Sequence, residues 1–269
     1  MRPFRLLALT ACLSLSLSAS ASPDPCQQGN QLLEKAQYQQ AVTAYNQCLE
    51  QQPKDINAYF NRAGALTALK KYKEALSDYD QVLNLSPTDA EAYFNRGVIF
   101  LALKDYSHAA EDLNLAIELA PTDASFYTHR GQANMGLKQY PLALQDYNKA
   151  LELDQKQLLA LAGRGSLYLQ MNRYAQASED LSKALRMGHK DAQSWFDRGL
   201  AYFHLQRYPE AIRDFSEVVR QNPKAANAFY NRGMAQVMLK HCPQAKADFT
   251  RACQLGDAAA CQAKLAKCQ

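Results

Sequence analysis

The chain repeats itself every 34 residues. The sequence of residues 59–62 returns unchanged at residues 93–96, and an arginine recurs at the same spacing at positions 62, 96, 130, 164, 198 and 232. A fixed period between about 20 and 50 residues is typical of arrays built from one supersecondary unit. Because each unit of such an array buries its apolar face against its neighbours, the period predicts an elongated molecule with a long continuous surface.

Seven units fit this period when position 1 is set at Ser22. They span residues 22–55, 56–89, 90–123, 124–157, 158–191, 192–225 and 226–259. Position 8 is Gly or Ala in every unit, position 20 is always Ala, and position 24 is Tyr, Phe or Leu. Apolar residues spaced by three and four predict two helices in each unit, and the small residues let the two backbones approach closely. We expect residues 260–269 to add a C-terminal capping helix.

A proline near the end of several units is expected to stop the second helix of the unit. It stands at positions 53, 87, 121 and 223. Units four, five and seven have Gln155, His189 and Asp257 there instead. We therefore expect the junctions after those three units to be less sharply broken.

The unit resembles the tetratricopeptide repeat (TPR), a helix hairpin with aromatic, Gly, Ala and Pro residues at set positions. An arginine replaces the usual Leu before the glycine, and unit one has Pro25 and Cys26 where an aromatic pair is expected. The resemblance covers residues 22–259 and implies an all-α fold, a right-handed superhelical solenoid of antiparallel helix pairs. Residues 90–123 fit the pattern closely, at Tyr93, Gly97, Phe100, Ala109, Leu113, Ala116 and Pro121.

Every arginine at position 7 is matched by an aspartate at position 23 of the same unit. In a hairpin that turns near position 15 these two positions lie opposite each other, so we expect guanidinium and carboxylate to bridge the two helices. A catalytic acid pair is the alternative, but six copies in six units favour a structural role. The predicted ion pairs are Arg62–Asp78, Arg96–Asp112, Arg130–Asp146, Arg164–Asp180, Arg198–Asp214 and Arg232–Asp248.

The first 21 residues have the pattern of a cleavable signal peptide. Arg2 and Arg5 precede a short apolar stretch, residues 6–17, and residues 19–21 form a small-residue cleavage site. The alternative is a buried N-terminal helix. A second interpretation comes from residues 9–12, which resemble a bacterial lipobox and would make Cys12 a lipidated N-terminus, converting a soluble exported protein into a membrane-anchored one.

Six cysteines follow residue 21, and an even number suggests disulfides in an exported chain. Neighbouring cysteines on one predicted helix are eleven or seven residues apart, spans of roughly 16 and 10 Å that are too long for a disulfide. Bonds must therefore run between helices, at the two ends of the array. A metal site is the alternative, although no Cys-x2-Cys motif is present. The predicted pairs are Cys253–Cys261, Cys242–Cys268 and, by elimination, Cys26–Cys48.

In TPR arrays the first helix of each unit lines the concave face with positions 2, 5, 6, 9, 12 and 13. The resemblance therefore implies a groove whose aromatic, methionine and amide side chains suit an extended peptide or an amphipathic helix. In units two to seven almost no charge falls at these positions, with Glu91 and Asp197 as exceptions. The expected partner-binding residues are Phe60, Asn61, Phe94, Asn95, His129, Phe196, Leu200, Phe203, Tyr230, Asn231, Met234 and Met238. The strongest patch is expected at Phe196, Phe203, Tyr230, Met234 and Met238, although several of these residues could instead pack between successive first helices.

TPR domains that clamp the C-terminal carboxylate of cytosolic chaperones need cations at set groove positions. Asn30 and Asn61 match that pattern, but Cys26, Glu91 and Asn95 replace the cations. The sequence therefore argues against this class of partner.

Composition excludes other classes of function. The chain has 30 basic and 26 acidic residues, with no basic run that would mark a nucleic-acid or membrane surface. No nucleophile–base set, phosphate loop or metal motif is visible, so we expect no catalytic residue, metal ligand or cofactor.

We therefore expect a non-enzymatic protein-interaction scaffold or adaptor that binds a peptide or helix of a protein partner. The signal peptide implies a periplasmic or secreted protein, and family analogy places it in cell-envelope assembly or secretion. The alternatives are a lipoprotein adaptor anchored through Cys12 and an enzyme with a pocket that the sequence does not reveal.

Overall fold

The structure, a computed structural model, describes residues 24–263. These residues form helices and contain no strand. The helices are α1 (Pro25–Glu34), α2 (Tyr38–Gln51), α3 (Ile56–Ala68), α4 (Tyr72–Leu85), α5 (Ala90–Ala102), α6 (Tyr106–Leu119), α7 (Ala124–Gly136), α8 (Tyr140–Leu153), α9 (Leu158–Gln170), α10 (Tyr174–Arg186), α11 (Ala192–His204), α12 (Tyr208–Gln221), α13 (Ala226–Met238), α14 (Cys242–Gln254) and α15 (Ala258–Cys261).

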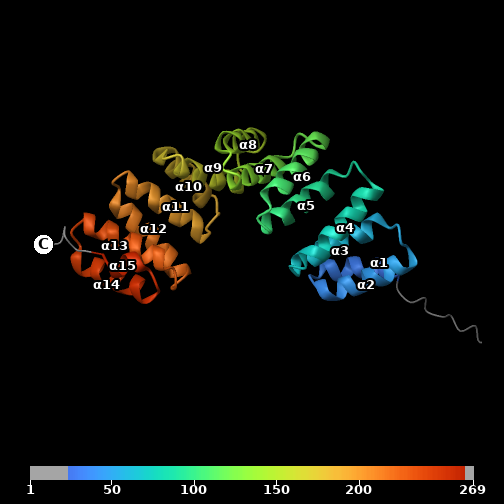
Figure 1. Ribbon diagram of the computed structural model, residues 1–269, viewed down its shortest axis with the longest axis horizontal. Coiled ribbons are helices and arrows are strands. Elements are labelled where there is room, and N and C mark those ends of the chain that lie inside the picture. The colour runs from blue at the N-terminus through green and yellow to red at the C-terminus, as the bar shows by residue number, and fades with distance from the viewer. Residues whose placement is uncertain (1–23, 264–269) are drawn as a thin grey trace, which may run out of the picture.

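Successive helices pack as pairs, and the pairs follow one another along an arch (Figure 1). Within each pair the first helix has an odd number and the second an even number. Six of the seven first helices begin at position 1 of the unit numbering. The second helices of units one to six all begin at the tyrosine of position 17. The predicted fold class, an all-α solenoid of helix pairs, is confirmed.

The first helices form the inner layer of the arch. Each first helix contacts the first helix of the next unit, from α1 with α3 through to α11 with α13, as well as its own second helix. The inner positions of neighbouring units therefore make one continuous surface. No helix in residues 24–263 combines the length and the apolar character that crossing a lipid bilayer requires.

Small residues allow the close contact within each pair. The alanine at position 20 is completely buried in all seven units, as in Ala211. Opposite it, the glycine at position 8 leaves room for the large side chain at position 24. A Cβ added to Gly199 would lie 2.8 Å from the ring of Phe215, which is itself fully buried. The pattern of small and large residues thus sets the spacing of the two helices.

The turn inside each pair has a backbone conformation that the sequence does not predict. The residue at position 15 has a φ between 54° and 61° in every unit, a left-handed conformation, and none of the seven is Gly. In unit two the amide of Lys70 donates to the carbonyl of Thr67 and the amide of Lys71 donates to that of Leu66, both at 2.9 Å. These two hydrogen bonds satisfy the last carbonyls of α3, and the chain reverses its direction here. The seven residues are Ala36, Lys70, Lys104, Lys138, Asn172, Gln206 and Lys240.

The junctions between units are equally sharp with and without proline, so the expectation of weaker breaks after units four, five and seven is wrong. Helix α8 ends at Leu153, the same unit position as Leu85 and Leu119 in units with proline. Units five and seven break even earlier, because Gly188 (φ 109°) and Gly256 (φ 96°) take a left-handed conformation that favours glycine. In these two units glycine thus replaces proline as the helix stop.

The described residues hold only one short helix where a capping helix was predicted at residues 260–269, and this helix already ends with Gln262 as its C-cap. Helix α15 spans Ala258–Cys261, and Asp257 caps it by accepting a hydrogen bond from the amide of Ala260 at 2.9 Å. Residues 264–269 lie outside the described part of the chain, as do the predicted signal peptide and Cys12.

Candidate functional site

The predicted groove residues lie on the inner layer of the arch, on helices α3, α5, α7, α11 and α13. All twelve are half-buried, and none belongs to the fully buried core or to the freely exposed surface. Side chains in this state have one side fixed by packing and the other side available for contact. The inner face therefore has the partly exposed apolar character that favours a binding surface.

The aromatic members of the groove pack on other rings, either in their own unit or across a unit boundary. Phe60 meets Tyr79 edge to face, with ring centres 5.6 Å apart, and Tyr230 packs on Phe249 at 5.8 Å. Phe94 contacts the ring of His129 at 5.0 Å, across the boundary between units three and four. Packing of this kind fixes the rotamers of the rings, so a ligand would meet a preformed apolar surface.

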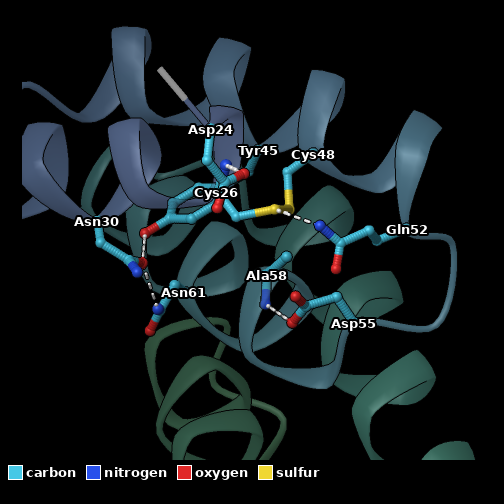
Figure 2. Close-up of a disulfide and its surroundings, with 9 residues drawn as sticks. All are labelled: Asp24, Cys26, Asn30, Tyr45, Cys48, Gln52, Asp55, Ala58 and Asn61. Atoms are coloured by element: carbon cyan, nitrogen blue, oxygen red, sulfur yellow. Dashed lines mark hydrogen bonds between the residues drawn. A yellow bond between two sulfur atoms is a disulfide. The ribbon is translucent and has the colours of Figure 1, made fainter. Parts of the chain in front are cut away.

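The amide side chains of the groove are less available than the sequence suggested. Asn61 donates to Asn30 at 3.0 Å, and the hydroxyl of Tyr45 donates to the same oxygen at 2.8 Å (Figure 2). Asn231 donates to the carbonyl of Asn227 at 2.8 Å. The side chain of Asn95 makes no hydrogen bond to another residue in the described part of the chain. Of these three amides, Asn95 is the one that retains its full capacity for a ligand.

His129 is held in its neutral form. Its Nδ1 lies 2.8 Å from the carbonyl oxygen of Ser125, so Nδ1 carries the proton and donates to this acceptor. Burial lowers the pKa of the imidazole, and the hydrogen bond to Ser125 and the charge of Asp123 oppose the shift only in part. The other ring nitrogen is therefore an acceptor at neutral pH.

A cavity of about 420 Å³ opens on the inner face between units three and six. Its lining residues come from α7, α9 and α11, from the turn that follows α7, and from the first residues of α6 and α8. This position is closer to the middle of the arch than the patch predicted in units six and seven. The lining residues are Tyr106, Gln132, Met135, Gly136, Lys138, Tyr140, Ser166, Gln170, Gln193 and Asp197.

This cavity is not evident from the sequence. Gln132, Ser166, Gln170 and Asp197 stand at inner positions 9, 13 and 6 of their units, but nothing in the period shows that they converge. Gly136 supplies part of the space, because a Cβ there would lie 2.5 Å from the ring of Tyr106. The signal that was visible is Asp197, a charged residue at a position where other units have Asn, Gln, His or Gly.

The structure places all six predicted Arg–Asp pairs in direct contact. In units two and three, Arg62 and Arg96 each donate two hydrogen bonds of 2.7 to 2.8 Å to Asp78 and Asp112. The six aspartates are 3% to 7% exposed, so their charges need these partners. Two other cavities, along the outer helices, are lined in part by the Arg62–Asp78 and Arg130–Asp146 pairs. The guanidinium and carboxylate groups of these pairs already form hydrogen bonds with each other.

Each arginine also reaches the unit before its own, which the sequence pattern did not reveal. Arg96 donates through Nη1 to Asp80 at 2.7 Å, and Arg198 donates to Ser182 at 3.1 Å. The acceptor stands 16 residues before the arginine, as the main aspartate stands 16 residues after it. The arginines therefore connect neighbouring units as well as the two helices of one unit. The six acceptors are Asn46, Asp80, Asn114, Asn148, Ser182 and Ser216.

Disulfides join helices at both ends of the array. Cys26 on α1 and Cys48 on α2 are bonded, with Cα atoms 4.9 Å apart, and the amide of Gln52 donates to the sulfur of Cys26 (Figure 2). Cys253 on α14 is bonded to Cys261 on α15, with Cα atoms 4.8 Å apart. Cys268, the predicted partner of Cys242, lies outside the described residues.

One group in residues 24–263 has the spacing of a metal site, and it includes this first disulfide. Potential ligand atoms of Cys26, Cys48 and Asp55 lie within 4.8 Å of one another. The two sulfurs are bonded to each other, however, and Asp55 accepts a hydrogen bond from the amide of Ala58 at 2.9 Å (Figure 2). A thiolate is needed to bind a metal, so the oxidised pair does not supply that donor.

Sequence models of the tetratricopeptide repeat match most of the chain. Matches described as tetratricopeptide repeat cover residues 26–55, 90–123 with 124–157, and 163–226 with 205–260, and one described as TPR repeat covers residues 63–104. No curated protein sequence matches this chain.

Several solved structures share the fold. The crystal structure of YrrB, a TPR protein with an unusual peptide-binding site, has a TM-score of 0.54 at 20% identity and covers 70% of this chain and 96% of YrrB. A tetratricopeptide repeat protein from Parabacteroides merdae has a TM-score of 0.66 at 20% identity, covering 86% of this chain and 92% of its own. PilF of Pseudomonas aeruginosa has a TM-score of 0.67 at 18% identity, covering 76% and 92%.

At these identities the structural likeness supports the fold alone, whereas the sequence models match the repeats themselves. The two agree along almost the whole described chain. The chain belongs to the tetratricopeptide repeat family, a family of protein-interaction scaffolds.

Proposed function

We propose that this protein is a non-catalytic adaptor that binds a peptide or helix segment of a protein partner along the inner face of the arch. The observation that carries the proposal is the cavity of about 420 Å³, which opens in a row of half-buried aromatic, methionine and amide side chains. Concave, largely apolar sites with a few polar groups are typical of ligand binding.

The distribution of charge supports a peptide as the ligand. The inner positions of units two, four and seven are uncharged. The arginine side chains at position 7 form hydrogen bonds with aspartates on the second helices. Such a surface has no basic stripe for nucleic acid, and it has no cation cluster for a chaperone C-terminus. Apolar contact with hydrogen bonds to the ligand backbone is the recognition mode that remains.

We further propose that the protein acts outside the cytoplasm, in the periplasm or as a secreted protein. The pattern of residues 1–21 supports export, and the joined cysteines Cys26–Cys48 and Cys253–Cys261 suit an oxidising compartment. A role in cell-envelope assembly or secretion rests on family analogy. The lipobox-like residues 9–12 favour a second form, an adaptor anchored through a lipid on Cys12.

A charge placed on the inner face tests the binding proposal. Tyr230→Asp is compared with Leu142→Asp, because Leu142 is 49% exposed and lies on the second helix α8. Crosslinking followed by affinity purification from the envelope fraction of the source cell identifies the partner of the unmodified protein. We expect Tyr230→Asp to abolish recovery of that partner and Leu142→Asp to retain it. Unchanged recovery with Tyr230→Asp, at retained helicity, would reject this part of the groove as the binding site.

The N-terminus of the purified protein tests the two forms. A protein that begins at Ser22 fits cleavage after residue 21, whereas a mass that corresponds to an acylated Cys12 fits the anchored form. Intact-mass measurement on protein from the membrane and soluble fractions separates these outcomes.

A further inference from the structure

The cavity on the inner face contains a carboxylate without an opposite charge. Asp197, on α11, is 6% exposed and lines the cavity wall. Its two hydrogen-bond donors are neutral, the hydroxyl of Ser166 on α9 and the amide of Gln193, the latter at 2.7 Å. Within residues 24–263 it has no ion pair, in contrast to the six buried aspartates at position 23. A buried charge without a partner is unfavourable, so a cation that enters the cavity gains an attraction that water has not screened.

The other charges near this carboxylate do not neutralise it. Lys138 lines the same cavity from the turn between α7 and α8, but it does not pair with Asp197. Asp191, at the start of α11, is also negative and is bonded to His189 and to the hydroxyl of Ser194. Burial first, and the charge of Asp191 second, raise the pKa of the Asp197 carboxyl against the opposing effect of its two hydrogen bonds. The carboxylate of Asp197 is therefore left without a neutralising partner among the described residues.

The remaining hydrogen-bond capacity fits a donor-rich ligand. Each oxygen of Asp197 accepts one hydrogen bond, and a carboxylate oxygen has room for a second. Gln132 and Gln170, whose amide oxygens can accept hydrogen bonds, also line the cavity, as do the aromatic residues Tyr106 and Tyr140. Acceptors and rings around one carboxylate are the surroundings that a guanidinium or ammonium group prefers.

We propose that the cavity is a subsite for one cationic side chain, Arg or Lys, of the peptide that binds in the groove. The inference rests on the proposed function and adds to it a requirement on the partner's sequence. Unit six has Asp197 at position 6, whereas the residues at that position in the other units are uncharged: Gln27, Asn61, Asn95, Gly163, Asn231 and the neutral His129. One cationic residue in the partner would therefore fix the register of the whole peptide on the array.

Two matched variants isolate the charge. Asp197→Asn places in unit six the residue that Asn61, Asn95 and Asn231 already place at this position, and its amide oxygen can still accept from Ser166. Asp191→Asn removes the same charge from the same helix outside the cavity lining, and Asn retains the capping function. Circular dichroism and thermal melting check that both variants fold.

Phage display of random 12-residue peptides on the full-length mature protein supplies the ligand. A selected peptide and analogues in which one Arg is replaced by citrulline, or one Lys by norleucine, are then titrated by calorimetry. We expect one such replacement to weaken binding to the unmodified protein and to Asp191→Asn at least about tenfold, and to change binding to Asp197→Asn by less than about twofold.

Equal weakening of binding to the unmodified protein and to Asp197→Asn would overturn the inference, as would selected peptides that lack a cationic residue. Either result leaves the proposed function intact, because a peptide still binds. If no selected peptide binds the folded protein, or if Met135→Asp in the cavity wall leaves binding unchanged, the proposed groove itself is wrong and this inference fails with it.

Discussion

The guanidinium of Arg96 donates two hydrogen bonds of 2.7 Å to the carboxylate of Asp112, and a third of 2.7 Å to Asp80 of the preceding unit. The same arrangement recurs along the array, with the second acceptor changing between Asn, Asp and Ser. One arginine per unit thus holds together three helices from two units. Because a solenoid gains its stability from such contacts between nearest neighbours, the loss of one arginine should weaken a junction rather than one hairpin alone.

Arg96→Met should lower the free energy of unfolding by about 3 kcal/mol, because it leaves the charge of Asp112 buried without a partner. Asp112 is 4% exposed, whereas Asp80 has 55% of its side chain exposed. The double variant Arg96→Met with Asp112→Leu should regain most of the loss, and Asp80→Asn should cost less than about 1 kcal/mol. Urea denaturation measures all three. A cost below about 0.5 kcal/mol for Arg96→Met would contradict the structural role assigned to the pair.

Gly199→Ala should destabilise the protein by about 1 to 3 kcal/mol, because the new methyl group would lie 2.8 Å from the buried ring of Phe215. Gly64→Ala is the matched control, since no atom lies within 4 Å of a Cβ added there. In a helix this second change should stabilise the protein by about 0.5 to 1 kcal/mol. Opposite signs in thermal melts would support the helix spacing described above, whereas two stabilising changes would contradict it.

Replacement of both Cys26 and Cys48 by Ala should loosen the first unit alone. The bond closes a 22-residue separation and should contribute about 3 kcal/mol to that unit. Hydrogen exchange read by mass spectrometry should show faster exchange in α1 and α2 and unchanged exchange in α7 and α8. The mass of the unreduced natural protein should be lower than that of the reduced protein by two hydrogens for each disulfide. Exchange that rises evenly along the array would refute the local role.

His129 should make the stability of the protein fall in mild acid. Burial lowers the pKa of this imidazole in the folded protein, so the unfolded chain takes up its proton first. The contribution of neutral His129 is therefore present above the unfolded value of about 6.5 and is lost as the pH falls from there towards the folded pKa.

The matched variant is His129→Asn, because Asn61, Asn95 and Asn231 occupy the same unit position. The difference in unfolding free energy between the natural protein and this variant should shrink between about pH 7 and pH 5. His108 is present in both proteins, so its effect cancels in this difference. The hydrogen bond to Asp105 raises the pKa of His108, and its titration therefore changes stability in the opposite direction. A difference that stays constant over this range would show that His129 does not titrate with folding.

Most of the architecture could be predicted from the sequence because it depends on residues that repeat. Ala at position 20, Gly at position 8 and the Arg–Asp match report the same contact six or seven times, and each repetition removes alternatives. The turns could not be foreseen, because Lys70 and Gln206 take a left-handed conformation that usually marks Gly or Asn. Their conformation is imposed by the two helices that the turn must join.

The site was predicted less well, since it depends on residues that do not repeat. The inner positions were known from the resemblance, but the cavity needs Gly136, Ser166 and Asp197 from three units to converge. A single sequence gives no sign of which irregular residues meet. The amides show the opposite difficulty, because Asn61 looks available in the sequence and is bonded to Asn30 in the structure.

The central claim is that partners bind on the inner face of the arch. A photo-crosslinking amino acid at Gln170, an exposed residue of the cavity lining, tests it directly against the same group at Leu115, which is 38% exposed on the second helix α6. After illumination in the source cell, we expect one partner to be joined through position 170 and to be absent from position 115. Recovery of the same partner at equal yield from both positions, or from position 115 alone, would contradict it.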